Sequence, residues 1–410
     1  MKLLRSVKKH PFKSATRYYL LIVLTLAFLF FSGDFGLIDV QKTAIVMAVG
    51  IDKTENEFSV TSQIAIPQSS KQGKSTQTVQ IEGKGKTVAD AFSVINAKTG
   101  WYPKLVFCRL IILGEDTAKE DVFQALDFFL LDEYMSDNCL LATCDGKAKE
   151  LLNASALIDP SGSIAMQKVL SPHAERVGEV LTATLREFAI SYNGAAKAGY
   201  MPILKKEQQQ EKAKQQTSKP AASGGAEQGS SAQSGGSGEE KTEDKPVFSA
   251  GETALFVGGV RVGKLNRQET FAFSAVQNEL KLASYSVERE RDACTLSIKN
   301  NLRKKSFSVA KDGKATLTIT LTVTAGILDY NTPTQPADAG DVPEGVLPLA
   351  AQMLAGQVQT AFQKCQKFGC DLFELTSLLQ KREHKRFEAL QDEIVKNASL
   401  AIHVTFQNVR

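Results

Sequence analysis

The sequence predicts an α+β protein in which an N-terminal membrane helix precedes two or three extracytoplasmic domains of mixed, mostly antiparallel sheets backed by helices. Three patterns predict it: an apolar run near the start, alternating apolar and polar residues typical of strands, and apolar residues at helical spacing between them. The chain has 410 residues, 43% hydrophobic and 23% charged, which is typical of globular domains. At about 150 residues per domain, this length suggests two or three domains.

The first 17 residues form a basic tail. They contain no acidic residue and six basic ones: Lys2, Arg5, Lys8, Lys9, Lys13 and Arg17. Positive charge next to an apolar segment keeps that end of the segment in the cytoplasm. We therefore predict a cytoplasmic tail over residues 1–17 and a folded body outside the membrane.

An apolar run follows the tail. It covers the 16 residues from Tyr18 to Gly33 and reaches Ile38 only if Asp34 is included. Because a membrane-crossing helix needs about 20 apolar residues, this length lies between a signal-peptide core and a short anchor. No A-x-A cleavage site follows, and no cysteine precedes Cys108. We predict an uncleaved transmembrane signal anchor over residues 18–38 that contacts membrane lipid; a cleaved signal peptide is the alternative.

The rest of the chain is slightly acidic. Removing the six tail residues from the 49 lysines and arginines leaves 43 basic residues against 45 acidic ones. Nucleic-acid binding proteins use a basic face to release counterions from the phosphates. The charge balance therefore argues against a nucleic-acid partner.

A polar segment divides the body. From Lys205 to Lys245 there is no Val, Ile, Leu, Met, Cys or aromatic residue, so nothing offsets the entropy cost of ordering this segment. We predict a flexible linker over residues 205–246, between α/β domains at 39–204 and at 247–410. Such a linker could loop out of one compact body or tether two.

Strands and helices alternate before the linker. Residues 43–51 and 57–66 predict a hairpin. Helical spacing predicts one helix that buries Val88, Ala91, Phe92 and Ile95, and another that contains Val122, Leu126 and Phe129. The remaining predictions are strands near 76–82, 105–113, 138–145 and 200–204, a polar turn at 83–85, and a helix at 177–192.

The region after the linker also reads as α+β. Residues 252–265 predict a hairpin that turns at Gly258 and Gly259. Residues 316–324 alternate threonine with apolar residues, which predicts a strand with one wet and one buried face. Further predictions are helices at 268–280, 344–367 and 372–379, another helix after Arg382, and a last strand at 400–406.

The sequence shows no recognisable catalytic arrangement. His10 lies in the tail, and His173, His384 and His403 have no metal-ligand spacing. His403 is expected to be an exposed residue of the last strand. No nucleophile elbow, phosphate-binding loop or dinucleotide-binding glycine motif is present. We therefore predict no catalytic residue, no metal and no cofactor.

Six cysteines, at 108, 139, 144, 294, 365 and 370, leave the disulfide state open. On one strand, Cys139 and Cys144 would have Cα atoms about 16 Å apart, whereas a disulfide allows about 7 Å. Cys108 could neighbour either of them on an adjacent strand. Because it lies in an apolar run, a buried thiol is the expected state.

Three segments resemble the Ger(x)C family, the C subunits of nutrient germinant receptors in spore-forming bacteria. They are 43–67 (TAIVMAVGIDKTENEFSVTSQIAIP), 110–152, which contains ILGEDTA and DFF, and 251–269 (GETALFVGGVRVGKLNRQE). They occur in the family's order. Family members usually carry an N-terminal lipidated cysteine about ten residues before the AIV alanine, and Asp34 lies there in this chain. Because the lipidated cysteine of the family is absent at this position, we expect the apolar run itself to anchor the protein to the membrane.

The resemblance implies a non-enzymatic role. It implies a receptor subunit at the inner spore membrane, with the N-terminus in the cytoplasm, the folded domains on the outer face, and multi-spanning A and B type subunits as partners. It suggests three successive α/β domains and makes Glu269 a candidate partner contact, although an acidic residue at a helix start also has a structural explanation. An extracytoplasmic envelope hydrolase and a membrane-anchored solute-binding module are the alternatives.

Overall fold

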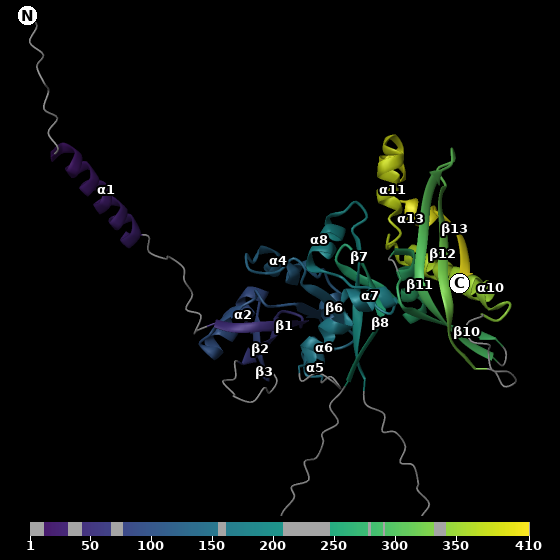
Figure 1. Cartoon of the computed structure of the whole chain (residues 1–410), viewed down its shortest axis with the longest axis horizontal. Helices are drawn as coiled ribbons and strands as arrows, with labels where there is room; N and C mark the ends of the chain where they lie inside the picture. Colours follow the sequence, from purple (N-terminus) through teal and green to yellow (C-terminus); the bar gives the residue numbers. More distant parts are fainter. Residues whose placement is uncertain are drawn as a thin grey trace, which may run out of the picture. The chain divides into compact units, whose positions relative to one another are not determined.

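The structure is a computed structural model, shown in Figure 1. It describes residues 12–31, 43–66, 77–154, 161–207, 247–277, 280–289, 292–331 and 342–409. These residues belong to two compact units, Met1–Thr43 and Ala44–Arg410.

The first unit contains one helix, α1, at Phe12–Phe31. It begins six residues before the predicted anchor. Residues 32–38 of that anchor and residues 1–11 of the tail lie outside the described part. Large apolar side chains on the helix are exposed, among them Leu20, Leu24 and Phe28. No helix among the described residues is long and apolar enough to cross a membrane, and the transmembrane anchor stays a prediction.

The second unit is built on a nine-stranded sheet in the order β3-β2-β1-β5-β6-β7-β8-β9, with β4 paired to β1. The four central strands, β1, β5, β6 and β7, are parallel neighbours, and the outer pairs are antiparallel. Apart from the β1–β4 pair, four strand pairs of this sheet are antiparallel and three are parallel, in agreement with the predicted mixed, mostly antiparallel sheets. Its strands are β1 Thr43–Lys53, β2 Phe58–Ile66, β3 Gln77–Gly85, β4 Tyr102–Lys104, β5 Leu110–Leu113, β6 Leu140–Cys144, β7 Ala198–Glu207, β8 Val247–Val257 and β9 Val260–Leu265.

Helix α2, Val88–Thr99, packs against β3 on one face of this sheet. Its buried residues are the four that the spacing predicted. The helix comes so close that a Cβ on Gly83 would lie 2.0 Å from the carbonyl oxygen of Ala91. The predicted polar turn at 83–85 is therefore wrong: these residues end β3, and the two glycines among them admit the helix.

The remaining helices of this region connect the parallel strands. The predicted helix at 177–192 begins later than expected: Val177 ends α7, Gly178 caps that helix with φ of 78°, and α8 starts only after Thr184, which forms a capping box. The strand predicted at 105–113 is also shorter and begins at Leu110. The helices are α3 Glu115–Ala118, α4 Phe123–Leu131, α5 Ala148–Leu152, α6 Gly162–Val169, α7 Pro172–Val177 and α8 Leu185–Asn193.

The predicted linker interrupts this sheet. Strand β7 continues through Lys205 and Lys206 to Glu207, and Glu207 pairs with Val247 at the start of β8. The first three residues of the predicted linker are therefore strand, and residues 208–246 lie outside the described part. Because its two ends meet in one antiparallel pair, the segment is an insertion in one compact body, which is the first of the two alternatives.

A second sheet has four strands in the order β10-β11-β12-β13. Along β12, Leu317, Ile319, Leu321 and Val323 are buried, as the threonine alternation predicted. Strands β10 and β11 were not predicted. The elements are α9 Arg267–Gln277, β10 Ala283–Arg289, β11 Asp292–Val309, β12 Ala315–Asn331, α10 Val346–Phe368, α11 Leu375–Arg382, a 3-10 helix His384–Arg386, α12 Phe387–Leu390, α13 Ile394–Asn397 and β13 Ser399–Asn408.

The two sheets share a hydrophobic core. Leu255 and Leu265 of the first sheet belong to the same buried cluster as Phe273 of α9 and Phe362 of α10. Two further clusters cover the two faces of the first sheet. The protein is thus a mixed α+β fold, in which the second sheet begins at β10, well after the insertion.

Candidate functional site

The strongest candidate site lies where the parallel strands of the first sheet end. In open α/β sheets, ligands bind outside the carboxyl ends of the strands, where neighbouring strands connect in opposite directions. Here β1 is followed by β2 on one side, whereas β5 on its other side leads to β6. A cavity of about 300 Å³ opens beside this point, lined by Asp52, Lys53, Thr54, Glu57, Ser59, Glu82, Lys84, Asp116, Gly146, Lys147 and Lys149. We call it the carboxyl-edge cleft.

Asp52 forms the floor of the carboxyl-edge cleft. Its carboxylate accepts hydrogen bonds from the backbone nitrogens of Ala148 (2.7 Å) and Lys149 (3.0 Å), the first residues of α5. Burial raises the pKa of this carboxyl group, and the two backbone bonds partly oppose that rise. A Cβ on Gly114, the residue after β5, would lie 2.1 Å from the carboxylate oxygen. Only glycine at position 114 leaves room for this cap.

Glu82 holds one wall of the cleft. One carboxylate oxygen lies 2.6 Å from the Lys149 ammonium, and the other accepts a 2.6 Å hydrogen bond from the Ser59 hydroxyl. The hydrogen bond from Lys149 is the main reason that the pKa of Glu82 is lowered. Lys53 pairs similarly with Glu120. Most cleft charges are thus committed to partners within the protein.

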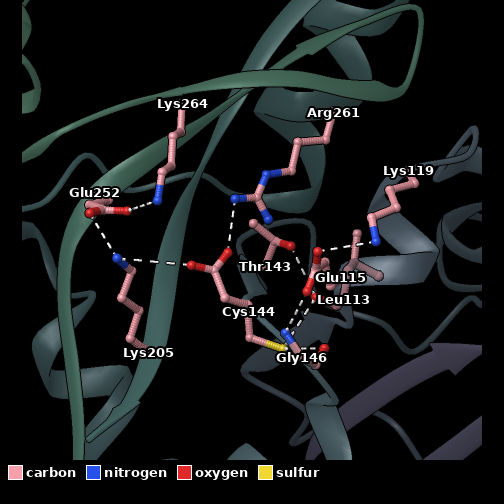
Figure 2. A network of polar contacts seen from close by, with 11 residues as sticks. Leu113, Glu115, Lys119, Thr143, Cys144, Gly146, Lys205, Glu252, Arg261 and Lys264 are labelled. Atoms are coloured by element: carbon pink, nitrogen blue, oxygen red, sulfur yellow. Dashed lines mark hydrogen bonds and ion pairs between the residues drawn. The ribbon is translucent and has the colours of Figure 1, made fainter.

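A second network continues along the same edge, as Figure 2 shows. Asp145, just after β6, pairs with Arg261 at 2.9 Å and with Lys205 at 3.9 Å. Glu252 then bridges Lys205 (2.7 Å) and Lys264 (2.8 Å). Burial alone would raise the pKa of Glu252, but the hydrogen bonds from the two lysines together lower it. This network joins the hairpin β8–β9 to the parallel strands.

The β5–β6 end of the network is held by backbone groups. The Glu115 nitrogen donates to the Gly146 carbonyl at 2.8 Å, and the Gly146 nitrogen donates back to the Glu115 carboxylate at 3.2 Å. The Cys144 thiol donates to the Gly146 carbonyl at 3.4 Å (Figure 2). Burial raises the pKa of Cys144 well above its usual range, so the thiol stays protonated and is a poor nucleophile.

The cleft can hold a small polar molecule. Lys84 and Lys147 line it and form no ion pair with another described residue. Among the residues that the structure describes, no group of three or more His, Cys, Asp or Glu side chains could hold a metal ion. No histidine and no accessible thiol lies in the cleft lining. The cleft therefore favours binding by charge over acid–base or nucleophilic chemistry.

Glu269, the predicted partner contact, lies elsewhere and is buried with 4% of its surface exposed. Its carboxylate accepts from the Asn266 backbone nitrogen at 2.8 Å, while Asn266 accepts from the Glu269 nitrogen at 2.9 Å. This is a capping arrangement at the start of α9. The same carboxylate pairs with Lys364 of α10 at 2.7 Å. The structural explanation accounts for each of these bonds of Glu269, and a partner contact there stays a prediction.

The other predictions for single residues can be compared with the described part of the chain. All six cysteines are buried and free, as expected for Cys108. His403 is an exposed residue of β13, as predicted, and His173 and His384 are also exposed. The cleft itself was missed. Its signal in the sequence was that Asp52 and Gly114 each follow a predicted strand and that Asp145 ends another.

Comparisons with known proteins assign the chain to a family. Residues 37–206 match the family "Spore germination protein N-terminal domain", and residues 251–410 match "Spore germination B3/ GerAC like, C-terminal". The two matches meet at the insertion within the first sheet. No curated protein matches the chain.

A solved structure supports the fold. The crystal structure of the GerBC protein is similar over 88% of this chain and 97% of its own, with a TM-score of 0.51 and 15% sequence identity. At this identity the likeness concerns the fold alone. The two family matches together cover most of the chain, and the chain therefore belongs to the GerAC-like family of spore germination proteins.

Proposed function

We propose that this chain is a non-enzymatic subunit of a membrane germinant receptor complex required for nutrient-triggered spore germination. The observation that carries the proposal is the match of both halves, 37–206 and 251–410, to spore germination domains in the family's order. The proposed partners are the A and B type membrane subunits of the receptor.

The non-enzymatic part of the proposal is supported by the chemistry of the carboxyl-edge cleft. Catalysis of hydrolysis needs a positioned acid, base or nucleophile. The Asp52 and Glu82 carboxylates instead accept bonds from α5 and Lys149, and the nearby Cys144 thiol is buried. An envelope hydrolase, the first alternative, finds no support among these side chains.

The cleft favours a solute-binding module as a second candidate function. Its volume of about 300 Å³ is at the lower end of the range for small-molecule sites, which are mostly lined by apolar side chains. The cleft lining is charged instead, with four lysines and four acidic residues. Such a site would suit a small zwitterionic or anionic solute, and this binding is compatible with a receptor subunit.

We further propose that α1 attaches the protein to the inner spore membrane, with the folded body on the outer face. The exposed apolar side chains of α1, from Tyr18 to Phe28, and the basic residues before it support this arrangement. Mass spectrometry of the native protein tests it. A chain that retains Lys2 supports the anchor, whereas an N-terminus between Ser32 and Ile38 would show a cleaved signal peptide.

A deletion strain tests the receptor function. Spores without this chain should lose the response to one class of nutrient while vegetative growth is unchanged. The measurement is the fall in optical density of spore suspensions with each nutrient, with the reintroduced wild-type gene as control. Normal germination with every nutrient, in a strain without a second copy, would rule out the proposed function.

A further inference from the structure

Large exposed apolar side chains are concentrated in two short segments of the body. Among the described residues of the body, thirteen such side chains are exposed, and seven lie within residues 101–107 and 130–134. Leu131 has 83% of its surface exposed and Phe107 has 51%. The seven, which we call the amino-edge patch, are Trp101, Tyr102, Val106, Phe107, Leu130, Leu131 and Tyr134.

Strand register places both segments at the edge of the sheet opposite the carboxyl-edge cleft. Ala48 of β1 pairs with Leu110 of β5, and Leu110 pairs with Leu140 of β6, all in parallel. The segment 105–109 therefore precedes β5 at the amino edge, and residues 132–139 precede β6 at the same edge. Strand β4, which contains Tyr102, pairs with β1.

The segments that carry the amino-edge patch are anchored by buried side chains of the hydrophobic core. Leu105 in the first segment and Cys108 just after it are buried in one cluster with Phe129, Met135 and Cys139, which flank the second segment. The Cys108 and Cys139 side chains are close enough to interact, which contributes to the raised pKa of Cys139. The outward apolar side chains are thus held on a fixed surface, and exposed apolar patches of this kind mark interaction sites.

Chain connectivity indicates what covers the patch. The first residue of β1, Thr43, also lies at the amino edge, and eleven residues separate it from the end of the apolar helix α1. The twelve Cα–Cα steps across this segment reach at most about 43 Å in full extension. A membrane that holds α1 is therefore within reach of the edge that carries the patch.

The composition of the patch fits a lipid surface. Tryptophan and tyrosine are enriched where protein meets the lipid headgroups, because their rings are apolar and carry one polar group. Nearby charges nearly balance, with Lys104 and Arg109 against Asp132, Glu133 and Asp137. The contact would therefore depend on apolar burial and would not require anionic lipid.

We propose that the amino-edge patch rests on the surface of the bilayer, so that the body contacts lipid independently of its N-terminal helix. This contact goes beyond the proposed receptor function, because it names a lipid-binding surface on the folded body. It would fix the orientation of the body, with the carboxyl-edge cleft facing away from the membrane.

Trp101 allows a direct test, because it is the single tryptophan of the chain. The full chain is reconstituted into vesicles of neutral phosphatidylcholine that contain brominated lipid, and Trp101 fluorescence is recorded. The proposal predicts strong quenching by the brominated lipid and protection from iodide in the water. Sedimentation with the vesicles separately reports attachment through α1. The absence of quenching by brominated lipid, in chains that sediment, would overturn the proposal. Iodide quenching would then show that the patch faces water, and protection from iodide would show that a protein covers it.

Two variants sharpen the test and keep the Trp101 reporter. Phe107→Ser and Leu131→Ser should each shift the equilibrium away from the lipid-contacting state by about tenfold, the value of burying one large apolar side chain, and the double variant should shift it by about a hundredfold. Leu302→Ser, at a leucine of β11 whose exposure of 64% lies between those of Phe107 and Leu131, is the matched control and should leave quenching unchanged. Unchanged quenching in the double variant, with a native circular dichroism spectrum, would also overturn the proposal.

Discussion

The two edges of the first sheet differ in what they present to their surroundings. At the carboxyl edge, charges are paired with one another, as in the chain from Asp145 through Lys205 to Glu252. At the amino edge, the apolar side chains of Phe107, Leu131 and Tyr134 are exposed. Paired charges are stable in water, whereas an exposed apolar patch calls for a partner. The difference indicates that the carboxyl edge is stabilised by its own charge pairs, whereas the amino edge presents an apolar surface suited to a partner.

The largest loss in the free energy of unfolding is expected from Gly114→Ala, which disturbs the Asp52 cap at the carboxyl edge. The added methyl group would overlap the Asp52 carboxylate, so α5 must lose its cap or move, at a cost of about 1–3 kcal/mol in the free energy of unfolding. Urea denaturation of the full chain in detergent measures it. Gly356→Ala in α10 is the control, since nothing lies near its Cβ position and a helical alanine should stabilise by about 0.5–1 kcal/mol. A neutral Gly114→Ala would mean that Asp52 does not depend on this close approach.

A smaller, pH-dependent effect is expected from Glu82→Gln. Because the folded-state pKa of Glu82 is lowered, its ionised form stabilises the fold above the unfolded pKa, and this stabilisation is lost as the pH falls through the folded pKa. We expect the variant to lose about 1 kcal/mol at pH 7 and nearly nothing at pH 3, in line with hydrogen bonds to charged groups that are partly exposed.

Unfolding curves at the two pH values check this prediction. Glu55→Gln, an exposed carboxylate of the β1–β2 turn, is the matched control and should change stability by less than about 0.5 kcal/mol at either pH. A loss in Glu82→Gln that is the same at pH 3 and pH 7 would show that the ionised carboxylate is not the stabilising species.

The smallest effect is expected from Lys264→Ala. Its ammonium pairs with Glu252 at 2.8 Å, but 46% of the lysine side chain is exposed. Exposed pairs contribute about 0.2–1 kcal/mol, and salt screens them. The expected loss in unfolding free energy is therefore at the low end of this range and should shrink further in 1 M salt. A loss as large as that of Gly114→Ala would show that the outer network is a main support of the edge.

Local periodicity made much of the fold predictable. The buried face of α2, the β8–β9 turn at Gly258 and Gly259, and the alternation along β12 follow from spacing within one segment. Strands β10 and β11 were missed because β11 carries many charged and polar residues, among them Lys299, Asn301 and Lys305, which hide its apolar period. The predicted turn at 83–85 was wrong because the glycines there are needed for the close packing of α2 against the end of β3, and not for a change of chain direction.

The carboxyl-edge cleft and the amino-edge patch depend on tertiary pairing. The sequence placed Asp52 directly after one predicted strand and Asp145 at the end of another, but it did not show that β1, β5 and β6 are parallel neighbours. It also gave no sign that Arg261 would reach Asp145, 116 positions earlier. The amino-edge patch was missed for a different reason. Residues 105–109 were assigned to a strand, but β5 begins only at Leu110, and Val106 and Phe107 before it are exposed.

The composition of the native complex tests directly whether this chain is a subunit of a germinant receptor. The full chain, tagged at its C-terminus and produced from its own gene, is purified from spore membranes in mild detergent, and the proteins bound to it are identified by mass spectrometry. We expect multi-spanning A and B type receptor subunits to elute with the chain in a constant ratio. A chain that elutes alone, at the mass of its 410 residues and detergent, while those subunits elute together elsewhere, would contradict its role as a receptor subunit.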